Sequence, residues 1–143
     1  MTNYSKILVA VDLSQDSDCI AKRALAISAD EAVDLHVIHV IEPLNFAYGG
    51  DIPMDFSGIQ DEIHQQALQQ LGKFADEHGF AEEQRHVVLG QPEVEIHALA
   101  DEIGADLIVV GSHGRYGLAL LMGSTANGVL HGATCDVLAV RVG

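Results

Sequence analysis

Three glycines recur at three-residue steps toward the end of the chain, at Gly111, Gly114 and Gly117. Glycine takes positive φ without strain and lets the backbone approach a ligand closely. A run of such residues can point several backbone N–H groups into one concavity, which binds anions. The side chains of this run that can carry positive charge are His113 and Arg115. The pattern therefore predicts a phosphate-binding loop whose main contacts come from the backbone.

The segment Gly123-Ser124-Thr125 follows this loop and has the composition of a helix start. The free N–H groups and the dipole of a helix favour negative charge at that end, and the two hydroxyls can donate to phosphate oxygens. The alternative is that the glycines only turn the chain. The loop contains no Gly-Lys-Ser/Thr sequence, so it is not a P-loop of the Walker type.

Five short apolar runs are expected to form the strands that position this loop. Nearly continuous, β-branched runs of this kind are typical of strands buried on both faces. The predicted strands are residues 6–11, 35–41, 85–89, 106–110 and 136–142. Apolar residues at 3- and 4-residue steps predict four helices, over residues 18–29, 59–78 and 93–103 and from about Ser124.

The alternation of strands and helices predicts a single α/β domain over residues 1–143. Five parallel strands with right-handed crossovers carry helices on both faces, which gives a three-layer α/β/α, Rossmann-like architecture. Ligands of such folds bind beyond the carboxyl ends of the strands, where the strand order reverses. Residues 12–14, 41–43 and 111–117 should therefore meet at one edge of the sheet.

The charge balance argues against nucleic acid as a partner. Lysine and arginine total 7 against 21 acidic residues, for a formal net charge of −14. Such a field repels phosphate backbones, so a bound phosphate has to be held locally by backbone amides.

The N-terminal residues lack the apolar core of a signal peptide, and no apolar run approaches the roughly 18 residues that a membrane helix requires. A cytoplasmic protein that binds no membrane is therefore expected. Two cysteines, Cys19 and Cys135, are too few for a disulfide scaffold and are predicted to be free thiols.

These motifs together resemble the universal stress protein family over essentially the whole chain. The resemblance rests on Gly111-x-x-Gly114, on Gly123-Ser124, and on the sequences VAVDLS at residues 9–14, HVI at 39–41 and CDVLAV at 135–140. Some family members, those close to universal stress protein A, have lost the glycines of the ATP motif, whereas this chain retains them. Eight residues separate Gly114 from Gly123, one fewer than the spacing of about nine that is typical of the family.

The resemblance implies an adenine nucleotide alpha hydrolase-like fold that binds ATP or AMP, with or without Mg²⁺. Asp12 would contact the ribose or a metal-bridged phosphate, and Leu13 and Val40 would flank the adenine. The nucleotide-binding residues implied in this way are Ala10, Val11, Asp12, Leu13, Val40, Val110, Gly111, His113, Gly114, Arg115, Gly123, Ser124 and Thr125. For Asp12 the alternative is a carboxylate that caps the following helix. Ser14, Asp16 and Ser17 are also candidate caps of that helix.

Three functions are compatible with these residues. The favoured one is a stress-response regulatory module whose nucleotide occupancy changes a surface or dimer seen by an unidentified protein partner. The second is a slow Mg²⁺-dependent ATPase, in which Asp12 holds the metal and Arg115 steadies the γ-phosphate. The third and least favoured is a flavodoxin-like electron carrier, whose phosphate loop would follow the first strand instead.

No catalytic residue and no metal site are assigned from the sequence. The candidate general bases, Asp12 and His113, have no visible orienting partner. His36 and His39 face opposite sides of a strand, so they cannot share a metal ion.

The closing strand is expected at the edge of the sheet, where a symmetric homodimer would cover it, in agreement with the family resemblance.

Overall fold

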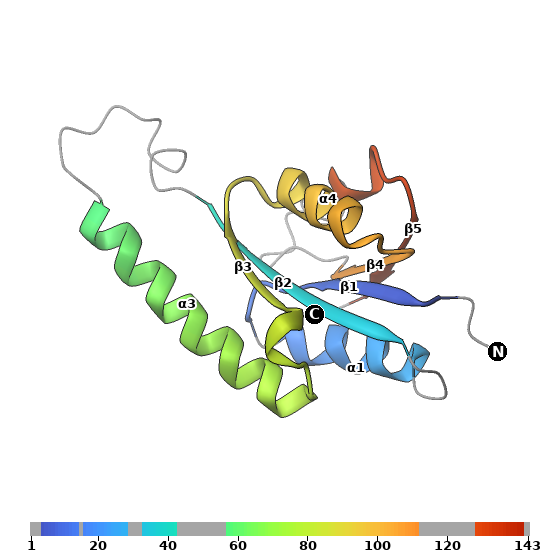
Figure 1. Ribbon diagram of the computed structural model, residues 1–143, viewed down its shortest axis with the longest axis horizontal. Helices are drawn as coiled ribbons and strands as arrows, with labels where there is room; N and C mark the ends of the chain where they lie inside the picture. Colours follow the sequence, from blue (N-terminus) through green and yellow to red (C-terminus); the bar gives the residue numbers. More distant parts are fainter. Residues whose placement is uncertain (1–3, 15, 29–32, 43–56, 112–127, 142–143) are drawn as a thin grey trace.

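The chain forms a five-stranded, wholly parallel sheet (Figure 1). The computed structural model describes residues 4–14, 16–28, 33–42, 57–111 and 128–141. The strands are β1 Lys6–Ala10, β2 Asp34–Ile41, β3 Arg85–Leu89, β4 Leu107–Gly111 and β5 Asp136–Val140. Their order in the sheet is β3-β2-β1-β4-β5, which places β3 and β5 at the two edges. The predicted α/β class, the parallel sheet and the edge position of the closing strand are confirmed.

The strand order also excludes one of the three functional hypotheses, the flavodoxin-like electron carrier. Flavodoxin-like sheets have the order 2-1-3-4-5, whereas Rossmann-type sheets begin 3-2-1-4-5. The observed order is the second of these. The flavodoxin-like interpretation is therefore wrong, because the chain leaves β1 toward β2 and β3 before it crosses back to β4.

Strand β1 lies at the centre of the sheet and is buried on both faces. Ile7, Leu8 and Val9 are 0% exposed. Val9 pairs with Val37 of β2 on one side and with Val109 of β4 on the other. Because neither face meets water, every position favours an apolar side chain, which explains the continuous apolar run in the sequence.

Three helices and one short 3-10 turn connect the strands in the described part of the chain. They are α1 Ser17–Ile27, α3 Ser57–His78, α4 Pro92–Ile103 and the 3-10 turn η1 Glu82–Gln84. Residues 128–130 are also helical and belong to the fourth predicted helix. Among the described residues, no helix is both long enough and apolar enough to cross a membrane.

The helices cover the two faces of the sheet, which confirms the three-layer prediction (Figure 1). Side chains of α1 and α3 pack with Ile7 and Val9 in one core cluster. Side chains of α4, together with Val129, pack with Leu8 and Ala10 in the other. Alternate residues of β1 thus supply the two separate cores.

The amino end of β1 is held to β4 by a single carboxylate. Asp106, which directly precedes β4, accepts hydrogen bonds from the backbone N–H of Ser5 at 2.8 Å and of Lys6 at 3.1 Å. Burial acts to raise the pKa of Asp106, but the hydrogen bonds from Ser5 and Lys6 outweigh it and lower the pKa below its usual value. The charged carboxylate therefore stabilises the pairing of β1 with β4 at neutral pH.

Glycine ends α4 for a backbone reason. Gly104 has φ +74° in the left-handed region, and its N–H bonds the carbonyl groups of the last turn. A Cβ added there would meet no atom within 4 Å, so only the backbone conformation requires glycine. Gly72, inside α3, also has open space around an added Cβ and carries no positive φ.

These two glycines form a matched pair for mutation. Gly104→Ala should destabilise the protein by about 1–2 kcal/mol, because an L-residue is strained in the left-handed region. Gly72→Ala should stabilise it by about 0.5–1 kcal/mol, since alanine favours helix. Urea denaturation of both variants measures the difference. Equal effects of the same sign would contradict the backbone explanation.

Candidate functional site

The candidate site lies where the carboxyl ends of β1 and β4 meet. From β1 the chain proceeds to β2 and β3 on one side, and only later to β4 and β5 on the other. After β1 it enters α1 on one face, whereas the residues that precede β5 pack on the opposite face through Val129. The connections therefore diverge at this point, as they do where nucleotides bind in Rossmann-type sheets.

Asp12 forms a tight turn directly after β1. Its Oδ1 accepts a hydrogen bond from the backbone N–H of Ser14 at 2.9 Å and from the hydroxyl of Ser17 at 3.2 Å. An aspartate that accepts from the N–H two residues later makes an Asx turn. The side chain of Asp12 is exposed, so the turn holds a carboxylate in solvent at the end of the central strand.

This geometry corrects the capping hypotheses for Asp12 and Ser14. The N-cap residue of α1 is Asp16, whose side chain makes no capping hydrogen bond. Asp12 bonds the turn and a side-chain hydroxyl, which places its carboxylate outside the N-cap position. Ser14 contributes its carbonyl, which accepts from the N–H of Ser17 at 3.1 Å.

Leu13 is held in an unusual backbone conformation next to Asp12. Its φ of +65° lies in the left-handed region, which costs a non-glycine residue roughly 1–2 kcal/mol. Its half-buried side chain packs against the core cluster on the α1 and α3 face, which offsets this cost. Such strain persists only where the surrounding structure specifies it, and it is common at binding sites.

A histidine that the sequence analysis left unassigned fixes the end of β1. The Nδ1 of His39 lies 3.0 Å from the carbonyl oxygen of Val11. Since a carbonyl only accepts, Nδ1 carries the proton in this contact. The N–H of Val11 in turn donates to Ile38 at 3.0 Å. The sequence analysis noted His39 in the family-like HVI motif. It could not identify the partner of His39 from residue spacing, because Val11 lies 28 positions away.

The remaining described site residues offer backbone rather than side chains. Val110 is 1% exposed, and Ala10 is 9% exposed. Val40 is half-buried against the same core cluster, on the α4 face of the sheet. Gly111 ends β4 and pairs with Val140 of β5. The structure thus brings these four residues to the carboxyl edge together with Val11, Asp12 and Leu13.

The predicted phosphate cradle extends beyond the part of the chain that the structure describes. The candidate residues outside it are His113, Gly114, Arg115, Gly123, Ser124 and Thr125. Residues 43–56, which follow β2, lie outside it as well. For these positions the assignments stay predictions.

Three possible metal ligands cluster between α1 and α3. Ligand atoms of Asp18, Glu77 and His78 lie within 4.8 Å of one another, and Nε2 of His78 is 2.8 Å from Oδ1 of Asp18. The ring of His78 also packs on Phe74, with 4.6 Å between ring centroids. Both acids are exposed, and the hydrogen bond from α3 to α1 accounts for the arrangement without an ion.

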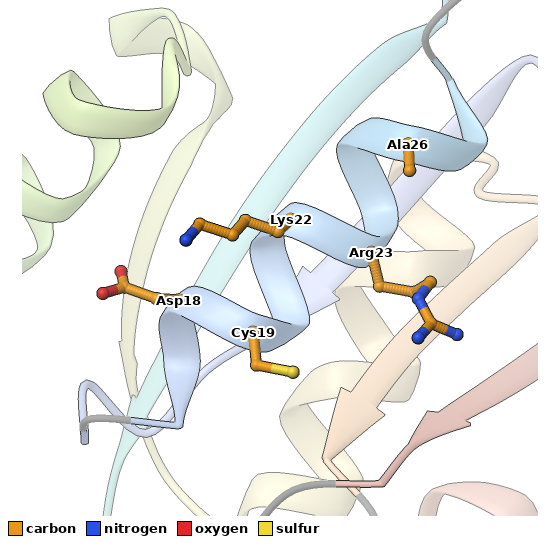
Figure 2. Close-up of a pocket in the computed structure, with 5 residues that line it drawn as sticks. All are labelled: Asp18, Cys19, Lys22, Arg23 and Ala26. Carbon is orange, nitrogen blue, oxygen red and sulfur yellow. The ribbon is translucent and has the colours of Figure 1, made fainter.

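A shallow hollow of about 470 Å³ lies on the outer side of α1 (Figure 2). It is lined by Asp18, Cys19, Lys22, Arg23 and Ala26, all of which are exposed. Figure 2 shows the Lys22 and Asp18 side chains on one side of the helix, with Cys19 and Arg23 directed away from them. The five lining residues all belong to α1, and none of them is among the predicted nucleotide-binding residues.

Cys19 and Cys135 are free thiols, as predicted. Cys19 is exposed, whereas Cys135 is half-buried. Burial raises the pKa of the Cys135 thiol, and the negative charges of Asp136 and Asp101 raise it further. Cys135 is therefore protonated and weakly nucleophilic at neutral pH.

Comparison with known proteins identifies close relatives of this chain. Residues 3–141 match the family model described as the universal stress protein family. The chain is 40% identical to universal stress protein A homolog 2 of Coxiella burnetii over 146 residues, which covers 99% of this chain and 98% of the relative. It is 33% identical to universal stress protein MJ0531 of Methanocaldococcus jannaschii, with 96% of this chain and 82% of the relative covered.

Two solved structures share the fold over nearly the full chain. The structure of the hypothetical protein MJ0577 superposes with a TM-score of 0.81 at 25% identity and covers 98% of this chain and 97% of that one. A universal stress protein in complex with cAMP superposes with a TM-score of 0.61 at 27% identity and covers 96% and 97%.

Two substitutions at Asp12 distinguish the contribution of its hydrogen-bond acceptor to stability from the contribution of its negative charge. Asp12→Ala removes the acceptor for Ser14 and Ser17 and should destabilise the protein by about 1 kcal/mol. Asp12→Asn keeps a side-chain oxygen for the Asx turn and should leave stability within about 0.5 kcal/mol of the wild type. Thermal denaturation of both variants tests this. Equal losses would show that the turn does not depend on the acceptor.

Proposed function

Because the chain belongs to the universal stress protein family, we propose that it binds an adenine nucleotide, ATP or AMP, at the carboxyl edge of its sheet. The observation that carries the proposal is the strained Asp12–Leu13 turn beside the end of β4, at the point where the connections diverge. In the register of the two strands, Val9 of β1 pairs with Val109 of β4. Asp12 and Gly111, the first residue of the glycine loop, each follow this pair within three residues along the chain.

The chemistry of the described residues fits a nucleoside. The exposed Asp12 carboxylate can accept hydrogen bonds from ribose hydroxyls or bind a metal-bridged phosphate. The side chains of Val40 and Val110 pack in the core cluster on the α4 face, so these two residues would contact the polar edges of the ligand through their backbone groups. The similarity to a family member in complex with cAMP supports an adenine nucleotide as the ligand class.

Phosphate binding has to overcome the overall charge of −14. In the proposed site the glycine loop and the Gly123-Ser124-Thr125 segment supply backbone and hydroxyl donors at close range. Occupancy by the nucleotide then changes the surface that a protein partner meets in the cytoplasm. Regulation by occupancy requires no chemical step.

Isothermal titration calorimetry with ATP, AMP and cAMP, each with and without Mg²⁺, tests the proposal. We expect saturable binding, weakened by about 10- to 100-fold in Asp12→Asn, because a hydrogen bond to a charged group is worth roughly 1.5–3 kcal/mol. Glu82→Gln is the matched control, since it also removes one exposed carboxylate charge. Glu82 lies just before β3, at the amino ends of the strands, whereas Asp12 follows the carboxyl end of β1. The absence of binding to every nucleotide would overturn the proposal, and so would equal weakening by both variants.

The same preparations distinguish occupancy from a slow ATPase. The occupancy mechanism predicts that radiolabelled ATP bound in the presence of Mg²⁺ is recovered intact. Hydrolysis that disappears in Asp12→Ala would instead assign the chain as an ATPase.

We also propose that the protein is a homodimer through β5. This strand pairs only with β4 in the described sheet, and its residues Val137, Leu138 and Ala139 are only half-buried. An apolar edge of this kind is an association surface, and two-fold pairing with a second copy covers it. Light scattering at micromolar concentration should give about twice the 15.3 kDa mass of one chain. A single-chain mass would contradict the dimer.

A further inference from the structure

A chain of hydrogen bonds joins three titratable side chains at the amino ends of β2 and β3. Nε2 of His36 lies 3.0 Å from Oδ2 of Asp34, and Nδ1 of His36 lies 3.0 Å from Nε2 of His86. The two imidazole rings are inclined by only 21°, with 5.2 Å between their centroids. The order of the groups is therefore Asp34, His36, His86.

The carboxylate at one end sets the tautomers along the chain. Asp34 accepts from Nε2–H of His36, so in a neutral pair Nδ1 of His36 is the acceptor and Nε2–H of His86 donates to it. One added proton is also accommodated. It places positive charge on His36 beside Asp34, and the donor and acceptor exchange roles between the two rings.

A second proton cannot be accommodated in this geometry. With both rings charged, both nitrogens of the 3.0 Å contact carry hydrogens, so the hydrogen bond is lost and two like charges face each other. Burial lowers the pKa of His86, and the charge of His36 lowers it further, in agreement with this cost.

Other charged and polar groups surround both ends of this hydrogen-bond chain. Asp34 also accepts from Nε2 of Gln84 at 2.7 Å and lies 3.7 Å from Nζ of Lys6 on β1. Burial acts to raise the pKa of Asp34, but the hydrogen bonds from His36 and Gln84 outweigh it and lower the pKa. On α4, the negative charge of Glu102 favours protonation of His86, but less strongly than burial and His36 oppose it.

His86 lies on β3, which is an edge strand of the sheet, so its protonation can affect how this strand is held. β3 pairs only with β2 in the described sheet, and His86 stands opposite Ile38 in the register. On the other face of β3, Arg85 is held to the carbonyl of Phe80 at 2.7 Å and to Asp76 at 2.6 Å. The histidine contact is therefore a titratable polar attachment of the start of β3 to β2, beside the hydrogen bond from Gln84 to Asp34.

We propose that the Asp34–His36–His86 chain is an acid-sensitive latch, which holds the start of β3 against β2 until both histidines are protonated. The latch opens as the pH falls below about 6.5, where the histidines of an unfolded chain become charged. In this range the folded state binds fewer protons than the unfolded state, so stability falls with the pH. Above it both rings are satisfied and the latch is closed.

Nuclear magnetic resonance of ¹⁵N-histidine-labelled protein between pH 8 and 4.5 tests the proposal. We expect His36 and His86 to titrate as a coupled pair in two separated steps, with Nε2 of His36 protonated throughout. Hydrogen-exchange protection factors of the β3 amides should fall with the second step. Independent titration of the two rings, or β3 protection that does not change, would overturn the proposal.

His86→Gln provides the matched variant, because the glutamine amide can donate to His36 but does not titrate. Between pH 6.5 and 5.5 the unfolding equilibrium constant of the wild type should rise by up to about tenfold relative to this variant. His131→Gln, at an exposed site, should show no such difference from the wild type. An equal pH dependence in all three proteins would count against the latch, and the wild-type titration decides the matter if His86→Gln does not fold.

Discussion

The burial of β1 on both faces is the constraint on which the rest of the molecule depends. A strand enclosed by two neighbouring strands and two layers of helices has no place for a polar side chain, so Ile7, Leu8 and Val9 are wholly buried. All polar chemistry is displaced to the two ends of the strands. At the carboxyl end this produces the Asp12 turn, and at the amino end it produces the contacts of Asp34, His36 and Asp106.

The carboxylates at the two ends of the sheet differ in their surroundings. At the amino end, carboxylates are satisfied by nearby donors: Asp106 by two backbone N–H groups, and Asp34 by His36 and Gln84. These contacts join neighbouring strands at their amino ends. At the carboxyl end, Asp12 is exposed and shaped by a turn, which suits a group that exchanges partners with a ligand.

The fold could be predicted from the sequence because its signals are local and periodic. The predicted run at residues 85–89 coincides with β3, and glycine marks the end of α4 at Gly104, where the left-handed conformation is observed. The position of Asp12 followed from the strand end, but its Asx turn and the positive φ of Leu13 did not, because both depend on packing around the turn. The partnership of His36 with His86 was invisible for another reason. It joins residues 50 positions apart, and only the register of β2 with β3 brings them together.

The pairing of β1 with β4 also has a consequence for how the chain is made. The contact between Ser5 and Asp106 joins residues 101 positions apart, and β1 needs both β2 and β4 as neighbours. A ribosome adds residues at roughly 5–20 per second, so the first strand emerges many seconds before its second partner exists. During that interval an apolar segment of the nascent chain has one open side, which is a binding opportunity for chaperones. Completion of the sheet therefore awaits the synthesis of β4 and β5.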